Sequence, residues 1–283
     1  MFYVTNVLYL CKIDTCKVGY HTEDVSGQDY PNQCVANKYS VTYDKNPPSN
    51  ASNEVQGTTV ESQHVYDIGS ALTTNGYTLT GWDFVDWNTK ANGTGTRYID
   101  DGKTTISNLT ATNGGTVTLY AQWKPKETSL SFDKNATDAT AGSTTQSCTA
   151  KYDNAMPNCN TTLPTRQGYT FKGFFDKAEG GTKYYNADGT SARTWNKTDE
   201  RVTLYAQWDQ CTKGYYCQGD NSKLSCPTAF YSDAGATYIT QCYLRTDIKL
   251  ADKFNPTGIS LFPNASTPDD SQTEKIYYID DNN

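Results

Sequence analysis

One seven-residue stretch with alternating apolar and polar positions occurs twice in the chain. Residues 117–123 and residues 202–208 both read Val-Thr-Leu-Tyr-Ala-Gln-Trp. On an extended backbone, the valine, leucine, alanine and tryptophan point to one side, and the other three residues point to the opposite side. The pattern predicts a half-buried β-strand, with Trp123 and Trp208 as buried anchors. Its recurrence at the end of two segments of domain size predicts a duplicated unit.

Further matches extend the duplicated unit upstream of the closing strand. Residues 76–82 read Gly-Tyr-Thr-Leu-Thr-Gly-Trp, and residues 168–174 read Gly-Tyr-Thr-Phe-Lys-Gly-Phe. A glycine stands just before the last aromatic residue of each copy, Gly81 in the first and Gly173 in the second. A glycine that interrupts strand alternation is typical of a bulge, which would turn the following aromatic side chain toward the core.

Polar turns divide the rest of each copy. Residues 39–46 and 129–135 alternate before an Asp-Lys-Asn turn, so each copy opens on a strand. Asp101-Gly102 and Asp188-Gly189 follow a Gly-Thr-basic-Tyr stretch in each copy. Asp-Gly is typical of hairpin turns, and we favour a turn over a calcium site because the ligand spacing of a calcium loop is absent.

These motifs resemble the Listeria–Bacteroides repeat, the internalin-type B repeat of bacterial surface proteins. Its hallmark is Gly-Tyr-Thr-Phe-x-Gly-Trp followed by Thr-Leu-Tyr-Ala-x-Trp, and the resemblance covers Tyr39–Trp123 and Ser129–Trp208. It implies a small β-grasp-like fold, a mostly antiparallel sheet crossed by a short helix or loop. In this chain Leu79 replaces the hallmark phenylalanine and Phe174 replaces the tryptophan. Extra residues around Asp83–Asn88 are expected to lengthen a loop in the first copy.

The predicted fold class is mainly β, with two tandem small β-grasp-like repeats and disulfide-rich, core-poor flanking modules. The chain has 283 residues, room for several small domains. The expected domains are a cysteine-rich N-terminal module at 1–38, repeat 1 at 39–125, repeat 2 at 126–209, a cysteine-rich module at 210–243, and a C-terminal segment at 244–283 that starts a further β domain.

The nine cysteines predict structural disulfides. Residues 211–242 resemble the cysteine-rich modules of tumour-necrosis-factor-receptor and ephrin-receptor type. Such modules have few apolar residues, so covalent bridges of about 2–4 kcal/mol each would stabilise their loops. The preferred pairs are Cys16 with Cys34, Cys148 with Cys159, Cys211 with Cys217, and Cys226 with Cys242. Cys11 is left without a partner, which hints at truncation. Zinc is the rival explanation, but the spacing is irregular and Cys-x-x-Cys is absent.

Targeting signals and net charge limit where the protein is expected to act and which partners it is expected to bind. Residues 1–10 are apolar but have no basic start or small-residue cleavage motif, so they predict a strand rather than a signal peptide. No apolar run approaches the roughly 20 residues of a membrane span. The formal net charge of −7 argues against nucleic acid and anionic membrane as partners. Repeats and cysteines together predict a bacterial surface or secreted protein.

Candidate chemistry is sparse. His21 and His64 are far apart in the sequence, and neither has an accompanying cysteine or carboxylate motif, so exposed polar roles are expected rather than a catalytic pair. No nucleophile, base and orienting group can be assembled, and we expect no enzyme activity, cofactor or metal.

Three functional classes are compared. The first is a spacer or adhesive stalk that displays binding surfaces to a host or neighbouring-cell surface protein or glycan. The second is a glycan- or protein-binding module that uses exposed tyrosines, with Tyr98, Tyr184 and Tyr185 as candidates. The competing interpretation of these rings is that they pack against their own sheet. The third class is an enzyme with an unfamiliar site, which we favour least.

Overall fold

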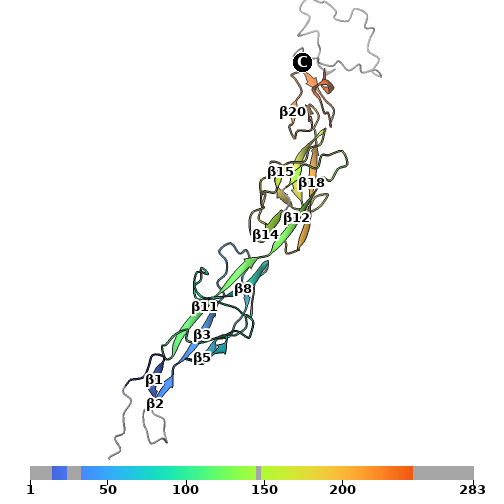
Figure 1. The fold of residues 1–283 in the computed structure, drawn as a ribbon. Helices are drawn as coiled ribbons and strands as arrows, with labels where there is room; N and C mark the ends of the chain where they lie inside the picture. The colour runs from blue at the N-terminus through green and yellow to red at the C-terminus, as the bar shows by residue number, and fades with distance from the viewer. Residues whose placement is uncertain (1–14, 24–32, 145–147, 245–283) are drawn as a thin grey trace, which may run out of the picture. The chain divides into compact units, whose positions relative to one another are not determined.

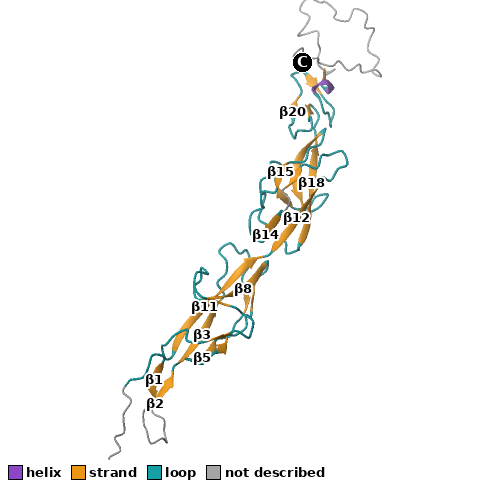
Figure 2. Cartoon of the chain, in the orientation of Figure 1, coloured by secondary structure: helices purple, strands orange, loops and turns teal. Residues whose placement is uncertain are grey.

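The computed structural model describes residues 15–23, 33–144 and 148–244, and these residues are almost entirely β-structure (Figures 1 and 2). They contain no α-helix, and their single helical element is the 3-10 turn η1, Ile239–Gln241. The chain divides between Lys126 and Glu127 into two compact units. Cys11, the apolar segment 1–10 and nearly all of the segment 244–283 lie outside the described residues.

Unit 1 holds a mixed five-stranded sheet with the strand order β5-β3-β11-β8-β9. β3 and β11 are parallel neighbours, and the other pairs in this sheet are antiparallel. The described strands of unit 1 are β1 Tyr20–Glu23, β2 Gln33–Ala36, β3 Lys38–Asp44, β4 Gln56–Gly57, β5 Ser62–Val65, β6 Ser70–Ala71, β7 Tyr77–Thr78, β8 Trp82–Asn88, β9 Arg97–Tyr98, β10 Thr105–Ile106 and β11 Gly115–Pro125.

Unit 2 holds a second five-stranded sheet with the order β14-β12-β18-β16-β17, in which β12 and β18 are the parallel pair. The two sheets therefore have the same strand order. In each, the strand that closes the sheet in the sequence lies in the centre, beside the strand that opens it. The strands of unit 2 are β12 Glu127–Asp133, β13 Ser143–Thr144, β14 Thr149–Lys151, β15 Asn160–Thr162, β16 Tyr169–Phe175, β17 Lys183–Tyr185, β18 Arg201–Gln210, β19 Tyr215–Tyr216, β20 Leu224–Ser225, β21 Phe230–Tyr231 and β22 Tyr243–Leu244.

The sheets confirm a mainly β fold, but the β-grasp assignment stays a prediction. Within the described residues, the segments that connect the strands of each five-stranded sheet are loops and two-stranded ribbons. These ribbons pair β4 with β7, β6 with β10, and β13 with β15. In the part of the chain that the structure describes, none of these connections contains the short helix that the repeat resemblance allowed.

The strand pairing corrects the alignment of the two copies. In unit 2, Phe171 lies opposite Trp208 and Phe174 lies opposite Ala206. In unit 1, Phe84 lies opposite Trp123 and Trp87 lies opposite Ala121. The structural counterpart of residues 168–174 is therefore 81–87, Gly-Trp-Asp-Phe-Val-Asp-Trp. The prediction that residues 83–88 form a loop insert was wrong, because they are the body of β8.

The bulges also differ from the sequence prediction in one copy. In unit 2 the register shifts between Phe171 and Gly173, and Gly173 has φ +128, so the predicted bulge is confirmed there. In unit 1 the equivalent shift leaves Val85 unpaired. Gly81, with φ +80, lies in a tight turn closed by the bond from Trp82 N to Leu79 O of 3.1 Å. The bulge predicted at Gly81 was therefore wrong, because the strand begins after this turn.

The closing strands turn their predicted apolar face into the core. Leu119, Ala121, Leu204 and Ala206 are fully buried. The tryptophans at the strand ends, Trp123 and Trp208, are only half-buried. The buried anchors are instead Trp87 and Trp195, both with no exposed surface.

His64 is buried, which corrects the expectation of an exposed side chain. It lies in β5, stacks on Tyr39 with 5.5 Å between ring centroids, and is 1% exposed. Its Nε2 lies 2.8 Å from the hydroxyl of Ser62 and its Nδ1 lies 2.7 Å from the hydroxyl of Ser70. The role is structural, since both ring nitrogens are occupied. His21, by contrast, is half-buried beside Asn37, with 2.7 Å between Nδ1 and Oδ1.

We expect repeat 1 to lose stability as the pH falls below about 6.5. Burial lowers the pKa of His64 below its ordinary value of 6.5. The unfolded chain therefore takes up the proton first, and no such effect acts above that pH, where both states are neutral. The urea midpoint of repeat 1 measured at pH 7 and pH 5.5 checks this. Both histidines precede residue 126, so unit 2 is an internal control. A pH response that persists in His64→Gln would contradict the assignment.

Candidate functional site

Four disulfides join the cysteine pairs that the sequence analysis favoured. The structure has Cys16–Cys34, Cys148–Cys159, Cys211–Cys217 and Cys226–Cys242. Stable disulfides are typical of proteins outside the reducing cytoplasm. The bridge of repeat 2 lies in its core, where Cys148 is 7% and Cys159 is 1% exposed. This burial supports a structural role for that pair.

The C-terminal cysteine module is not entirely without a core. Tyr216, Ala236 and Cys242 form a small buried cluster, with Phe230 and Ile239 packed against it. The module is nevertheless thin, since its only strand pairs are β19 with β20 and β21 with β22. Its stability therefore depends on the bridges more than that of the repeats does.

Reduction is expected to loosen the two cysteine modules before the repeats. In the presence of dithiothreitol, protease cuts should appear first in residues 15–23, 33–36 and 211–242, because the bridges there stabilise segments with little buried apolar surface. The five-stranded sheets should keep most of their circular dichroism signal. Mass spectrometry of the fragments over time gives the order of cutting. Equal cutting rates in modules and repeats would contradict this expectation.

The most elaborate polar site in each repeat is the Asp-Lys-Asn corner, where the first strand of the sheet ends. We define the repeat 2 corner as Asp133, Lys134, Asn135 and Trp208, and the repeat 1 corner as Asp44, Lys45, Asn46 and Trp123. In repeat 2 the carboxylate of Asp133 accepts a 2.7 Å bond from the backbone N–H of Asn135. Asn135 has φ +50, a left-handed conformation that asparagine tolerates. The chain thereby turns sharply out of β12.

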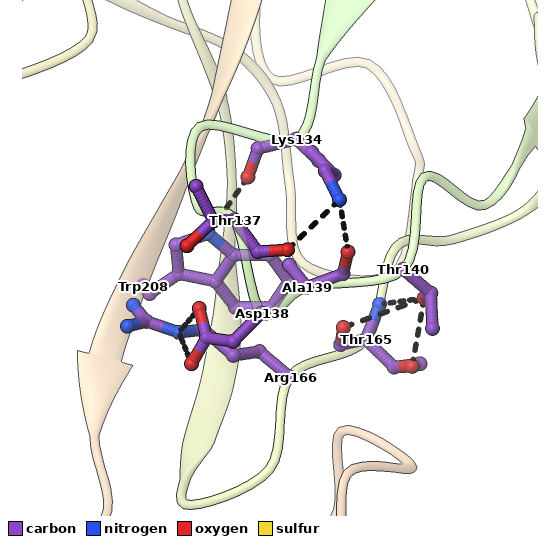
Figure 3. Close-up of polar contacts among 8 residues, drawn as sticks. All are labelled: Lys134, Thr137, Asp138, Ala139, Thr140, Thr165, Arg166 and Trp208. Carbon is purple, nitrogen blue, oxygen red and sulfur yellow. Dashed lines mark hydrogen bonds and ion pairs between the residues drawn. The ribbon is translucent and has the colours of Figure 1, made fainter.

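The side chains of the repeat 2 corner attach the turn to the closing strand and to the following loop, and Figure 3 draws Lys134 and Trp208 of this corner. The indole N–H of Trp208 donates to Lys134 O at 3.0 Å. The Nζ of Lys134 donates to Thr137 O at 3.2 Å and to Ala139 O at 2.7 Å. The amide of Asn135 donates to Ala206 O at 2.9 Å. The side chains of Asp133, Lys134 and Asn135 are thus all bonded within the fold.

The loop that follows the repeat 2 corner is bonded to Thr165 and Arg166, which precede β16, as Figure 3 shows. The guanidinium Nε of Arg166 lies 2.9 Å from one carboxylate oxygen of Asp138 and 3.0 Å from the other. Thr140 N donates to Thr165 O at 2.8 Å, and Thr165 N donates to the Thr140 hydroxyl at 2.9 Å. The Arg166 bond lowers the pKa of the Asp138 carboxyl from its usual value.

Repeat 1 builds the same corner from its own residues. Asp44 accepts from Asn46 N at 2.7 Å, and Asn46 has φ +41. The indole of Trp123 donates to Lys45 O at 2.9 Å, and Lys45 donates to Val55 O at 3.1 Å. The two units therefore form the same corner from equivalent residues. The sequence analysis found its Asp-Lys-Asn turn but missed its link to the closing tryptophan.

The prediction that Tyr184 and Tyr185 contact a ligand was wrong. Tyr184 is 2% and Tyr185 is 0% exposed, so neither ring can face a ligand. The Tyr184 hydroxyl donates to Asn196 at 2.7 Å, and that of Tyr185 donates to Pro157 O at 2.7 Å. Burial raises the pKa of both phenols. The packing interpretation is correct for these two rings, and Tyr98 is half-buried.

The two Asp-Gly sequences form turns of different kinds. Asp188-Gly189 closes a tight hairpin in which Asn186 N donates to Thr190 O at 2.9 Å. Asp101 binds the following backbone, accepting from Lys103 N at 2.8 Å and Thr104 N at 2.6 Å. It does not form a hairpin, because β9 pairs with β8 and β10 pairs with β6. Within the described residues, no cluster of three or more His, Cys, Asp or Glu could hold a metal ion.

A shallow depression of about 480 Å³ lies beside the Asp188-Gly189 turn. Met156, Pro157 and Leu163 supply apolar lining, and Asp188 and Asn160 supply polar groups. The oxygen and the nitrogen of the Asn160 side-chain amide are both buried without a hydrogen-bond partner. The sequence analysis missed Asn160, since nothing in its local pattern distinguishes it from the chain's many other asparagines.

No helix within the described part of the chain is both long and apolar enough to cross a membrane.

Comparison with known proteins agrees with the repeat resemblance for the second copy. The chain is 26% identical over 188 residues to a protein of Evansella cellulosilytica named as a Gly-rich membrane protein, an alignment that covers 65% of this chain and 20% of that protein. It is 29% identical over 170 residues to Internalin H of Listeria monocytogenes, covering 60% of this chain and 25% of that protein. The chain thus spans a quarter or less of the length of these relatives. No solved structure matches it. Residues 129–207 match the Listeria-Bacteroides repeat domain family, so this chain contains one such repeat, in unit 2.

Proposed function

We propose that this chain is a non-enzymatic segment of a bacterial surface or secreted protein, and that it acts as a spacer that displays binding surfaces. The proposal treats residues 39–125 as a second copy of the repeat. The equal strand order of the two sheets and the matched corners support that duplication. The surface location is supported by the disulfides and by the likeness of the chain to Internalin H.

The observation that carries the spacer proposal is the bonded junction between repeat 2 and the C-terminal cysteine module. β18 runs directly into Cys211, whose N–H donates to Gly168 O at 2.8 Å. Gly168 N donates in turn to Cys217 O at 3.0 Å. Asn221 adds a side-chain bond to Pro164 O at 3.0 Å. A junction with several backbone bonds resists bending, which a spacer requires.

The N-terminal module is joined to repeat 1 in a comparable way. Tyr66 N donates to Asn37 O at 2.8 Å, and the side-chain amide of Asn37 donates to Ala111 O at 2.6 Å. Lys17 Nζ and the Tyr20 hydroxyl both reach the carboxylate of Asp67, at 3.2 and 3.0 Å. Each cysteine module is therefore attached to its neighbouring repeat by hydrogen bonds and not by a free linker.

A display experiment tests the spacer role. The whole chain is placed between a membrane anchor and a terminal epitope tag on a bacterial cell, and binding of a bulky antibody is measured. The control replaces residues 127–242 by a Gly-Ser linker of the same number of residues. A flexible linker has an end-to-end distance of only about 5–6 Å times the square root of its residue number, so it should expose the tag less. Equal antibody binding by the two would reject the spacer role.

A second candidate function is glycan or protein binding at the depression beside Asp188. The lining of the depression favours it, because the Asp188 carboxylate beside an apolar floor can bind neighbouring sugar hydroxyls. Binding to a glycan panel should disappear in Asp188→Asn, which removes the charge and keeps the side-chain oxygen that accepts from Thr190, while Asn158→Ala should bind less strongly than the wild type but detectably. A panel with no wild-type binding would reject this candidate.

A further inference from the structure

In both repeats the first and last strands of the five-stranded sheet are parallel neighbours. In repeat 2, β12 and β18 pair from Ser129 opposite Arg201 to Asp133 opposite Tyr205. In repeat 1, β3 and β11 pair in the same sense. Because the paired strands run the same way, the chain enters each sheet at one end of the pair and leaves at the other. Tension applied along the chain therefore pulls the two strands in opposite directions along their length.

We propose that each repeat is a mechanical shear clamp that resists unfolding when the chain is under tension. In shear, the ladder bonds between the two strands are stretched together and must break together. In the alternative geometry, where force pulls the same ends of two strands apart, the bonds break one after another at low force. The inference rests on the proposed spacer function, because a spacer transmits force between its ends.

The corner of repeat 2 reinforces the clamp where β12 ends. The amide of Asn135 bonds to Ala206 O on β18 at 2.9 Å and to Ala178 O at 2.7 Å. The indole of Trp208, also on β18, holds Lys134 O at 3.0 Å. These bonds tie the end of the first strand to the last strand, so sliding of one past the other must break them as well as the ladder.

A pair of side chains bridges the two strands midway along the ladder. The hydroxyls of Ser131 and Thr203 lie 2.8 Å apart across the parallel pair. Repeat 1 places Thr42 and Thr118 in the same relation, with 3.1 Å between their hydroxyls. A longitudinal shift by one residue would separate both pairs, so they oppose sliding in the direction of the load.

Repeat 1 carries the same reinforcement at its corner. The amide of Asn46 donates to Ala121 O and to Ala91 O, both at 2.8 Å. The exit end of its closing strand is also fixed, since Lys126 N donates to Gly81 O at 2.8 Å. The corresponding bond of repeat 2 runs from Cys211 N to Gly168 O. Fixed exit ends prevent the strand from peeling and leave shear as the route of failure.

The direct test compares two pulling directions on the same folded chain. Unnatural residues that accept handles are placed at Glu127 and Asp209 for shear, and at Glu127 and Arg201 for peeling; all three side chains are exposed. The rupture force of repeat 2 in an optical trap should be severalfold higher in shear. Equal forces in the two directions would overturn the clamp, and would leave the display experiment on the spacer role unaffected.

A built-in marker identifies which rupture event belongs to repeat 2 when the chain is pulled from its two ends. Cys148 and Cys159 are 11 residues apart in sequence and 5.5 Å apart between Cα atoms. With about 3.3–3.6 Å per extended residue, reduction should lengthen the repeat 2 event by roughly 30–35 Å. The repeat 1 event should keep its length.

Matched corner variants test the reinforcement. Asn135→Gly and Asn46→Gly keep a residue that accepts positive φ and remove the side-chain bonds. Asn135→Gly should lower the rupture force of the event that lengthens on reduction, and Asn46→Gly should lower the other. Unchanged forces in both variants would overturn the role of the corners. Because the two-direction comparison uses the wild-type corners, it decides the clamp even if a variant folds poorly.

Discussion

Trp195→Ala is expected to destabilise repeat 2 by about 3–5 kcal/mol, the range for removing a buried large aromatic side chain. Trp195 has no exposed surface and packs on Tyr184 with 4.9 Å between ring centroids. Its indole N–H also donates to the hydroxyl of the fully buried Thr128 at 3.0 Å. The substitution therefore leaves a cavity and removes the bond that the Thr128 hydroxyl accepts, although this hydroxyl still donates to Asp199 O at 2.7 Å. Hydrogen exchange of the β18 amides measures the loss of unfolding free energy.

The control for this prediction is Trp208→Ala in the same repeat. Trp208 is half-buried and its main polar contact is the bond to Lys134 O, so its loss should be smaller than that of Trp195. Amides of β11 in unit 1 should exchange at wild-type rates in both variants. A larger effect from Trp208→Ala than from Trp195→Ala would show that the closing tryptophan is the anchor, as the sequence alone suggested.

Gly173→Ala is expected to destabilise repeat 2 by about 3 kcal/mol or more, from backbone strain and overpacking together. Gly173 has φ +128, and a Cβ there would lie 2.2 Å from the backbone oxygen of Tyr185. β17 approaches β16 this closely only because the residue has no side chain. Urea denaturation followed by circular dichroism measures the change in the unfolding free energy of unit 2.

Gly180→Ala is the matched control, because it places a side chain on a backbone with positive φ but causes no steric clash. Gly180 has φ +61 and no atom within 4 Å of the position a Cβ would take. A non-glycine residue in the left-handed region costs roughly 1–2 kcal/mol, so the loss should be clearly smaller than for Gly173→Ala. Equal losses would show that the close approach of β17 contributes nothing.

Repeat 1 shows why the close approach of β17 to Gly173 could not be predicted from the sequence. Its structural counterpart is Asp86, which is 5% exposed and forms an ion pair with Arg97 of β9. One repeat thus places a backbone contact where the other places a charged pair. The prediction had paired Gly173 with Gly81, because Gly-aromatic sequences occur twice in repeat 1, five residues apart. Only strand pairing distinguishes them.

Burial was the second point that the local pattern could not decide. Tyr184 and Tyr185 precede the Asp188-Gly189 turn in the sequence, yet both rings lie in the core. His64 has no local feature of a buried residue and is buried because Ser62, Ser70 and Tyr39 surround its ring. A side chain's burial depends on which distant strand covers it, and that information is not present in a short window of sequence.

The sequence by itself determined the β class, the strand that closes each repeat, the Asp-Lys-Asn turns and the cysteine pairs. Alternation and turn residues report on local backbone geometry, and two copies of a pattern report on duplication. The tertiary structure alone decided the register of residues 82–88, the burial of Trp87 and Trp195, and the link from each corner to its closing tryptophan. These features depend on contacts between strands that are far apart in the sequence. The loops between such strands can vary in length without changing the apolar–polar pattern of either strand, so the pattern does not fix the pairing.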